Sequence, residues 1–529
     1  MSEVNTSMSL AEHNGSLNTN QKIGVASVVI GLFLCLLAYM NFHITMGPAF
    51  MYAAIVLIIA GTVIYARATY LHLPEGIKNN NIFLRSFTNR GLWGWAAAVV
   101  LTAFYILLYW FPAYLGLGMN GEANWGIIGF FDPLSMLLKG QPASQWFMYG
   151  VFYTICILAM GYKFILKYRH NKYQVVRTIS VMFFQLAFAF LIPEFMLGMN
   201  LPFNDFKNMW PLNYYFFDGW HLQELLHEPL GIGLLMLVFG IAMIFIISPI
   251  LTYFYGKRWY CSWVCGCGGL AETAGDPFRH NSDKSLKAWR LERVLIHAVL
   301  VFACIMTIAV LYSFLVANPQ GYAFTKEMLT GTVVIVFGGL LLLMFIKPSQ
   351  FKSISRQNKS IIISILVVLI LFTLFAYFKN VQQVFFVDSQ KLRQWYGFYI
   401  GAAFSGVIGV GFYPIFGSRV WCRFGCPMAA ILGLQQRFFS RFRITTNGSQ
   451  CISCGNCSTY CEMGIDVRWY AQRGQNIVRA SCVGCGICSA VCPRGVLKLE
   501  NGPVNAKRTE IQMTTHDLVV YEDVNILPR

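Results

Sequence analysis

Charged side chains are scarce in this sequence. Lysine, arginine, aspartate and glutamate make up 12% of its 529 residues, about half of the quarter that is usual in soluble proteins, whereas 56% of the residues are hydrophobic. The mean hydropathy is +0.54. So little charge cannot cover the surface of an ordinary soluble protein of this size, and the composition therefore favours a membrane protein.

Several cofactor signatures are also missing. The sequence has no G-x-x-x-x-G-K-[ST] loop and no G-x-G-x-x-G that opens a helix after a strand, so we expect no nucleotide cofactor. It has no C-x2-C-H attachment motif, and His297 stands alone in its apolar stretch, so we expect no haem. No serine–histidine–aspartate set and no carboxylate pair indicates a stand-alone enzyme, and enzymatic activity stays an open question.

Apolar stretches, in contrast, are abundant. A helix needs about 20 mostly apolar residues to cross a bilayer, and ten stretches predict a polytopic α-helical membrane protein. The first 21 residues are polar and lack a basic start, so we expect no cleaved signal peptide and an uncleaved first span. The expected spans are 22–46, 49–66, 91–113, 146–168, 178–199, 230–256, 291–316, 330–346, 360–378 and 397–416.

The placement of basic residues predicts the orientation. The net charge is +17, but lysine and arginine gather in alternate loops, those after the second, fourth, sixth and eighth spans, and in the segment after the tenth. Because basic loops stay in the cytoplasm, we expect a protein of the bacterial inner membrane with both termini in the cytoplasm. The charge therefore indicates topology in a lipid bilayer, and we expect no nucleic-acid partner.

Eight cysteines near the C-terminus form two matched runs, each spaced C-x2-C-x2-C-x3-C. This spacing is typical of bacterial-type domains with two [4Fe–4S] clusters, in which the fourth cysteine of each run ligates the other cluster. Zinc is the alternative, because four cysteines also hold a tetrahedral zinc ion, but three cysteines packed twice into seven residues favour iron–sulfur. The expected ligand sets are Cys451, Cys454, Cys457 and Cys492, and Cys482, Cys485, Cys488 and Cys461.

One of the two runs departs from the usual pattern. Cys492 is followed by Pro493, whereas Cys461 is followed by Glu462. Proline normally turns the chain away from the cluster, with its fixed φ and missing N–H. A carboxylate in its place predicts a lower reduction potential for the cluster that Cys461 holds, and the alternative is that the substitution is simply tolerated.

A shorter cysteine motif occurs twice, immediately after two predicted spans. Residues 256–265 and 417–426 share Gly-x-Arg-x-aromatic-Cys-x3-Cys, which indicates an internal repeat. A spacing of four can place both thiols on one face of a helical turn, and we expect the neighbouring Arg258 and Arg419 to lower the thiol pKa values. Three interpretations stay open: a third metal centre, redox thiols or a structural role. The cysteines concerned are Cys261, Cys265, Cys422 and Cys426.

Twin Cys-x3-Cys motifs followed by two such cysteine runs resemble the NapH/NosR/CcoG-type family of membrane ferredoxins, over roughly residues 230–500. Cys422 to Pro427 matches the Cys-x3-Cys-Pro motif of the family, whereas Gly266 replaces the proline after Cys265 and a further thiol, Cys267, follows. The first five spans have no counterpart in that family, and the flavin-bearing domain of NosR-type members is not visible. The resemblance implies electron transfer between the quinone pool or cytoplasmic donors and extracytoplasmic redox proteins, or reduction of copper for oxidase assembly.

We therefore expect an electron relay between a cytoplasmic redox partner and the quinone pool or an extracytoplasmic redox protein. Copper reduction for respiratory-enzyme assembly and redox sensing are the alternatives. The expected organisation is a polar tail (1–21), a membrane region of five spans (22–229), a membrane core with both Cys-x3-Cys motifs (230–426), an amphipathic connector on the inner leaflet (427–446), a small α+β domain with two [4Fe–4S] clusters (447–502) and a C-terminal tail (503–529).

Few residues suggest a site on the other side of the membrane. The loop after the fifth span carries His221, Glu224, His227 and Glu228, which predicts either a metal or quinol site or a solvated amphipathic segment. Glu194 lies at the end of the fifth span, where we expect it to reach the interface rather than to relay protons.

Overall fold

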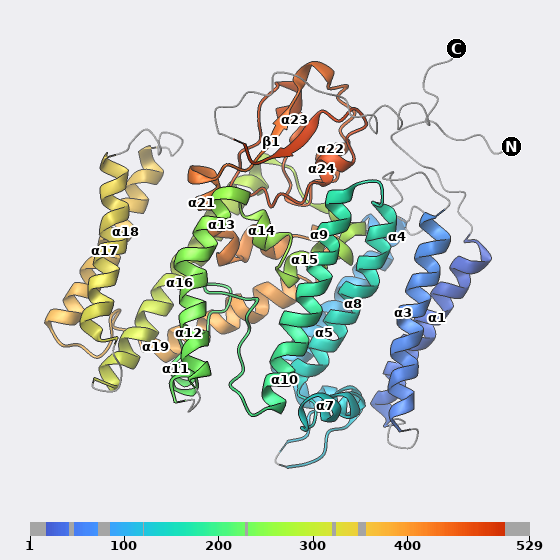
Figure 1. Cartoon of the computed structure of the whole chain (residues 1–529), viewed down its shortest axis with the longest axis horizontal. Helices are drawn as coiled ribbons and strands as arrows, with labels where there is room; N and C mark the ends of the chain where they lie inside the picture. Colours follow the sequence, from blue (N-terminus) through green and yellow to red (C-terminus); the bar gives the residue numbers. More distant parts are fainter. Residues whose placement is uncertain are drawn as a thin grey trace.

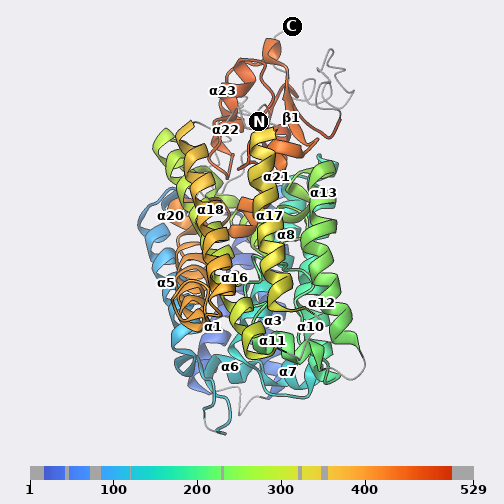
Figure 2. The same ribbon diagram turned by 90° about the vertical axis from the view of Figure 1, so that its left-hand side faces the viewer.

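The structure, a computed structural model, describes residues 17–41, 47–71, 85–119, 121–227, 231–319, 324–346 and 356–502. The predicted tail 503–529 and most of the tail 1–21 lie outside these residues. Long helices form a bundle, and a small domain that contains both strands lies at one end of it in both views (Figures 1 and 2). We call this the capped end of the bundle.

Nine helices in the described residues are long and apolar enough to cross a membrane, and they coincide with nine of the ten predicted spans. A helix bonds all its backbone groups internally, as a lipid environment requires, and these helices expose many large apolar side chains. The protein is a polytopic helical membrane protein. The nine are Thr19–Met40 (α1, Thr19–Leu37, and one 3₁₀ turn), Pro48–Tyr70 (α3), Leu92–Trp110 (α5), Gln145–Lys167 (α8), Lys172–Gly198 (α9, Lys172–Phe183, to α10, Ile192–Gly198), Ile232–Tyr255 (α12, Ile232–Ala242, to α13, Ser248–Tyr255), Leu286–Ala317 (α16), Lys326–Ile346 (α17) and Lys359–Phe378 (within α18, Arg356–Phe378).

The tenth predicted span, 397–416, differs from the helix that the structure has there. The helix begins earlier, at Ser389, as α19 (Ser389–Trp395), continues as a π-helical stretch and ends at Ile408. Its first segment, α19, carries Lys391 and Arg393, so this helix is less apolar than the other nine. The guanidinium Nε of Arg393 lies 2.7 Å from a carboxylate oxygen of Asp218, and this pairing explains why a charged turn continues the helix.

Polar side chains fix where several spans begin. Ser144, Asn171 and Ser285 each accept a hydrogen bond from a backbone N–H in the first turn of α8, α9 and α16, which satisfies donors that a helix start leaves free. The pair α17 and α18 lies at one side of the bundle, and α1 and α3 lie at the other (Figure 1). The central helices therefore carry the parts of the chain in which the cysteine motifs occur.

The C-terminal domain (Arg443–Glu500) is built on one antiparallel strand pair, β1 (Arg443–Thr446) with β2 (Leu497–Glu500). Three short helices lie between them, α22 (Asn456–Thr459), α23 (Val467–Gln472) and α24 (Ile487–Ala490). The stretch predicted as a leaflet-bound connector, 427–446, therefore differs from what is found. Its last four residues form β1, and its helix α21 (Pro427–Phe439) buries Met428, Leu432 and Gln436.

Candidate metal centres

Four cysteines of the C-terminal domain, which we call the first quartet, line one cavity of about 360 Å³, part of it open to solvent. Gly455, with φ +80°, reverses the chain before α22, a conformation that glycine adopts without strain. Cys454 is exposed and Cys457 is buried, so one edge of this group faces the solvent. The first quartet is Cys451, Cys454, Cys457 and Cys492.

Four further cysteines, the second quartet, line another cavity, of about 390 Å³. Helix α9 covers this group, because Tyr173 Oη donates to the carbonyl of Gly484 and Gln174 Nε2 donates to that of Cys485, both at 2.8 Å. The second quartet therefore faces the helix bundle rather than the solvent. It consists of Cys461, Cys482, Cys485 and Cys488, and both quartets join three cysteines of one run to the fourth of the other.

The separation of the sulfur atoms distinguishes zinc from a cluster. Zinc binds four thiolates at about 2.3 Å, which places the sulfurs about 3.8 Å apart. In the described ranges, one group of three possible ligand atoms lies within 4.8 Å of one another, and it belongs to Glu272, Glu462 and Cys485. No three sulfur atoms of a cysteine quartet lie as close together as that. The spacing of the cysteines fits a larger iron–sulfur group better than it fits a single ion.

The two copies of the Cys-x3-Cys motif bring a third group of cysteines together. Each of these cysteines is at most 6% exposed, and all four belong to one core cluster that also contains residues of the C-terminal domain, such as Ile444 and Val483. We call this group the membrane quartet. It consists of Cys261 and Cys265, at α14 (Arg258–Cys261) and before α15 (Gly266–Thr273), and of Cys422 and Cys426, before α21.

The internal repeat is visible in the backbone of the membrane quartet. In each copy the second cysteine donates its N–H to the carbonyl five residues earlier, Cys265 to Tyr260 (2.8 Å) and Cys426 to Trp421 (2.9 Å). The same two cysteines then stand at the N-caps of α15 and α21. Each copy also starts with a glycine at positive φ after a helix end. These are Gly256 (φ +66°) and Gly417 (φ +94°).

The expectation that neighbouring arginines make these thiols acidic is wrong for Cys261 and Cys422. Burial raises the pKa of Cys261 to about 12, and burial also raises the pKa of Cys422 although Arg419 acts to lower it. Arg258 lies over aromatic rings instead. At Cys261 and Cys422 a thiolate therefore requires a bound metal, which deprotonates its cysteine ligands.

Cys267, the additional thiol after the first motif, lies beside Cys265. Their hydrogen bond lowers the pKa of Cys265 to about 6, against the effect of burial. The same bond raises the pKa of Cys267, and burial adds to that. Cys267 is therefore the donor of this hydrogen bond and Cys265 is the acceptor.

Three buried cations surround the membrane quartet. Arg419 Nη1 lies 3.2 Å from the carbonyl oxygen of Cys261 and 3.6 Å from Sγ of Cys422. The two others are Lys257, four residues before Cys261, and Lys207, whose charge favours the thiolate of Cys265. All three cations are at most 6% exposed. Burying positive charge is costly unless negative charge compensates it. Arg419 pairs with the carboxylates of Glu272 and Glu462, whereas Lys257 Nζ has no hydrogen-bond partner among the described residues, so metal-bound thiolates fit the surroundings of this lysine.

Lys207 reaches the quartet because the chain between α10 and α11 (Gly219–Leu226) folds back into the bundle (Figure 1). Lys207 Nζ donates to Gln185 Oε1 at 2.9 Å, and Tyr260 Oη donates to Asn208 Oδ1 at 3.2 Å. The sequence analysis places this stretch in a loop outside the membrane. One sequence feature could have indicated that this stretch is buried: Lys207 is the single lysine or arginine of a long loop.

The structure does not bring together the polar residues of the loop after the fifth span. His221 is buried, with Nδ1 3.1 Å from the carbonyl oxygen of Phe216, whereas Glu224 and His227 are exposed. Glu228 lies outside the described residues. Nothing in the described part of this loop resembles a metal site.

The carboxylate that follows Cys461 joins the C-terminal domain to the bundle. Glu462 Oε2 lies 2.7 Å from Arg279 Nη1, and its Oε1 lies 3.0 Å from Arg419 Nε. Burial opposes ionisation, but these two arginines hold the pKa of Glu462 below its ordinary value. The two arginines thus compensate the charge of Glu462. The lower reduction potential of the cluster held by Cys461 stays a prediction.

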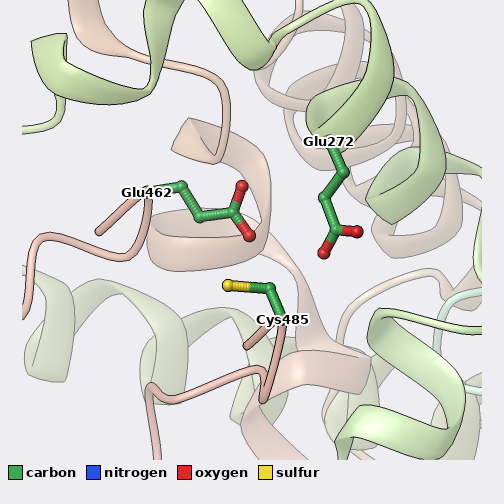
Figure 3. A group of neighbouring side chains, drawn as sticks. All are labelled: Glu272, Glu462 and Cys485. Atoms are coloured by element: carbon green, nitrogen blue, oxygen red, sulfur yellow. The ribbon is translucent and has the colours of Figure 1, made fainter. Parts of the chain in front are cut away.

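A second carboxylate, Glu272, lies beside Glu462 and Cys485 (Figure 3). Glu272 pairs with Arg177 and Arg419. Because arginines occupy both carboxylates, these three side chains are part of an ion-pair network next to the second quartet rather than a separate metal site. Sequence analysis missed this network, since its members come from distant segments.

Comparison with known proteins defines the class. Residues 237–285 and 399–445, which contain the membrane quartet, match a family model described as a 4Fe-4S binding domain. Residues 450–497, which contain the other two quartets, match one described as a 4Fe-4S dicluster domain. The chain is therefore a membrane iron–sulfur protein with ferredoxin-type domains, and iron–sulfur electron transfer is its function in the broad sense.

A single stretch also resembles a named protein. It is similar to the "Putative electron transport protein YccM" of Escherichia coli (strain K12), with 38% identity over 53 residues. The matched stretch is 10% of this chain and 15% of that protein, so the chain spans far less than two thirds of this relative. No solved structure matches the chain.

Proposed function

We propose that the protein is a membrane-bound electron relay with three iron–sulfur centres in series, held by the first, second and membrane quartets. A [4Fe–4S] cluster, when bound, takes up or releases one electron. The observation that carries the proposal is the graded burial of the three quartets. The first includes the exposed Cys454, the second is covered by α9, and the membrane quartet is buried throughout.

Direct contacts between the second and the membrane quartets support this order. Ser262, next to Cys261, donates from Oγ to the carbonyl of Val483, next to Cys482, at 2.9 Å. Arg419 joins the carbonyl of Cys261 to the Glu462 carboxylate, which follows Cys461. The two sites are therefore held at a fixed separation by buried polar contacts.

The orientation follows from the basic loops. Arg90, from the loop after the second span, donates to the carbonyl of Asn281 in the loop after the sixth, and the loop after the fourth span leads into α9, which contacts the C-terminal domain. These loops carry most of the basic residues between spans, so the positive-inside rule supports a cytoplasmic C-terminal domain in a bacterial inner membrane.

The partners follow from the two ends of the series. A cytoplasmic redox protein would exchange electrons at the exposed first quartet, and the quinone pool or an extracytoplasmic redox protein would do so beyond the membrane quartet. The resemblance to the NapH/NosR/CcoG-type family supports this assignment, and so does the printed name of the relative, a putative electron transport protein.

The test is the iron and acid-labile sulfide content of the full chain, purified anaerobically in detergent. Three centres predict about twelve of each per chain, and two centres about eight. Replacing Cys422 and Cys426 by serine is expected to remove about four irons, whereas Cys304→Ser, at a cysteine outside the quartets, is expected to remove none. About eight irons in the unmodified protein, unchanged in the double variant, would overturn the third centre.

A further inference from the structure

Lys257 is a buried lysine whose charge has no partner among the residues that the structure describes. The side chain is 0% exposed, and within the described residues its Nζ has no hydrogen-bond partner. The ion pairs found among those residues do not include it either. A buried ammonium without compensating negative charge is expensive. Negative charge must therefore lie near Lys257 when the protein is complete.

The backbone places Lys257 between two of the three quartets. Its carbonyl accepts the N–H of Cys261 at 2.9 Å, and its own N–H donates to Oε1 of Gln436 at 2.8 Å. Gln436 in turn donates from Nε2 to the carbonyl of Cys482 at 2.8 Å. Three hydrogen bonds thus lead from the membrane quartet through Lys257 to the second quartet.

The charges around Lys257 leave the cysteines as its counter-ions. Its positive charge favours the thiolate of both Cys261 and Cys482. The buried carboxylates of Glu272 and Glu462 pair with arginines instead. The second copy of the motif has Ser418 at the corresponding position, so the first copy alone carries a positive charge there.

We propose that the Lys257 ammonium is the shared counter-ion of the second quartet and the membrane quartet. This rests on the proposed function, because it requires a metal centre at both places. Lys257 is a positioning residue: it stabilises the more negative, reduced form of either centre and so keeps their reduction potentials high and close together. One electron leaves one centre and enters the other, while the ammonium keeps its proton and no bond is made or broken.

The test is a redox titration of the purified full chain, with each centre followed by electron paramagnetic resonance. In Lys257→Met, the equilibrium constants for one-electron reduction of the second and membrane centres are expected to fall at least tenfold. This corresponds to a decrease of at least 59 mV in each reduction potential. The first centre is expected to stay unchanged. Lys257→Arg is expected to restore both potentials, and Lys287→Met, at an exposed lysine on α16, is expected to leave all three as they were.

The outcomes separate this inference from the proposed function. About eight irons in the unmodified protein would overturn the membrane centre, and the shared counter-ion with it. About twelve irons with both potentials unmoved in Lys257→Met would overturn the inference alone. If Lys257→Met loses iron, Lys257→Arg decides: retained iron and potentials support the role of the charge, and loss in both variants contradicts it.

Discussion

Glu462 and Arg279 form an ion pair in which both side chains are fully buried, with 2.7 Å between Oε2 and Nη1. The carboxylate belongs to the ferredoxin-type C-terminal domain and the guanidinium to the segment before α16, so the pair crosses the boundary between the domain and the bundle. Arg419 binds the other carboxylate oxygen. The C-terminal domain is therefore fixed to the membrane core, as the proposed electron relay requires.

Removing the carboxylate should weaken this attachment. Glu462→Gln leaves Arg279 and Arg419 buried without one of their counter-charges, and breaking one side of a buried ion pair typically costs about 3–5 kcal/mol. We expect a lower thermal unfolding temperature and faster proteolytic release of the C-terminal domain in detergent. Glu224→Gln, at an exposed glutamate of α11, serves as the control. Equal stability of the two variants would show that the pair does not hold the domain.

The same network predicts a dependence of stability on pH. Burial would raise the pKa of Asp276, but Lys167 and Arg279 hold it at about 2, below the value of about 3.9 for an unfolded chain. A depressed pKa adds stability that is fully present above the unfolded value and is lost as pH falls through the folded one. The loss is expected between about pH 4 and pH 2.

Unfolding temperatures at pH 5 and pH 3 check this dependence. Asp276→Asn removes the titrating group, so its melting temperature is expected to fall less between the two pH values than that of the unmodified protein. Part of the slope should remain, because the pKa of Glu462 is lowered in the same direction. An identical slope in both proteins would exclude Asp276 as a source of the acid sensitivity.

Much of what the sequence predicts correctly depends on the spacing of residues that are close together in the chain. Nine of the ten spans coincide with apolar helices, because twenty uncharged residues need no distant partner to define them. The repeat at Cys265 and Cys426 was likewise visible in the sequence, since each copy folds on bonds within six residues. The spacing of the cysteines within each ferredoxin-type run is local in the same way, whereas the exchange of the fourth cysteine between the runs rests on the general pattern of two-cluster domains.

Long-range charge pairing lies outside what such patterns predict. Arg177 meets Glu272, and Arg279 meets Glu462, across separations of about one hundred and two hundred residues, so neither pair leaves a local signature. The inward fold of the stretch around Lys207 is hidden for a similar reason, because its depth depends on contacts with Gln185 and Tyr260. Burial likewise reversed the expected pKa shift at Cys261, since desolvation outweighs a neighbouring cation.

The crossed grouping of the two cysteine runs makes a spectroscopic prediction. Cys461 lies in the first run but lines the cavity of the second quartet, and Cys492 does the converse. We expect Cys461→Ser to alter the same paramagnetic resonance signal as Cys482→Ser, and Cys492→Ser to alter the same one as Cys451→Ser. Signals that instead pair Cys461 with Cys451 would contradict the ligand sets.

Gly268 makes a steric prediction for the membrane quartet. A Cβ atom at this position would lie 2.0 Å from the carbonyl oxygen of Cys261 and 3.0 Å from Nη1 of Arg419. The first contact is with backbone, so the first turn of α15 must move away from α14, and with it Cys265. Overpacking of a tight site usually costs about 1–3 kcal/mol, and here the strain falls on the geometry that holds two of the four cysteines.

We therefore expect Gly268→Ala to lose about four irons per chain and to keep the roughly eight of the ferredoxin-type domain. Gly331→Ala is the matched control, because a Cβ at that position in α17 meets nothing within 4 Å. Alanine is also the better helix former by about 1 kcal/mol, so the control should be as stable as the unmodified protein or slightly more. Full iron content in Gly268→Ala would mean that the close approach of α15 to Cys261 is not needed to hold the membrane centre.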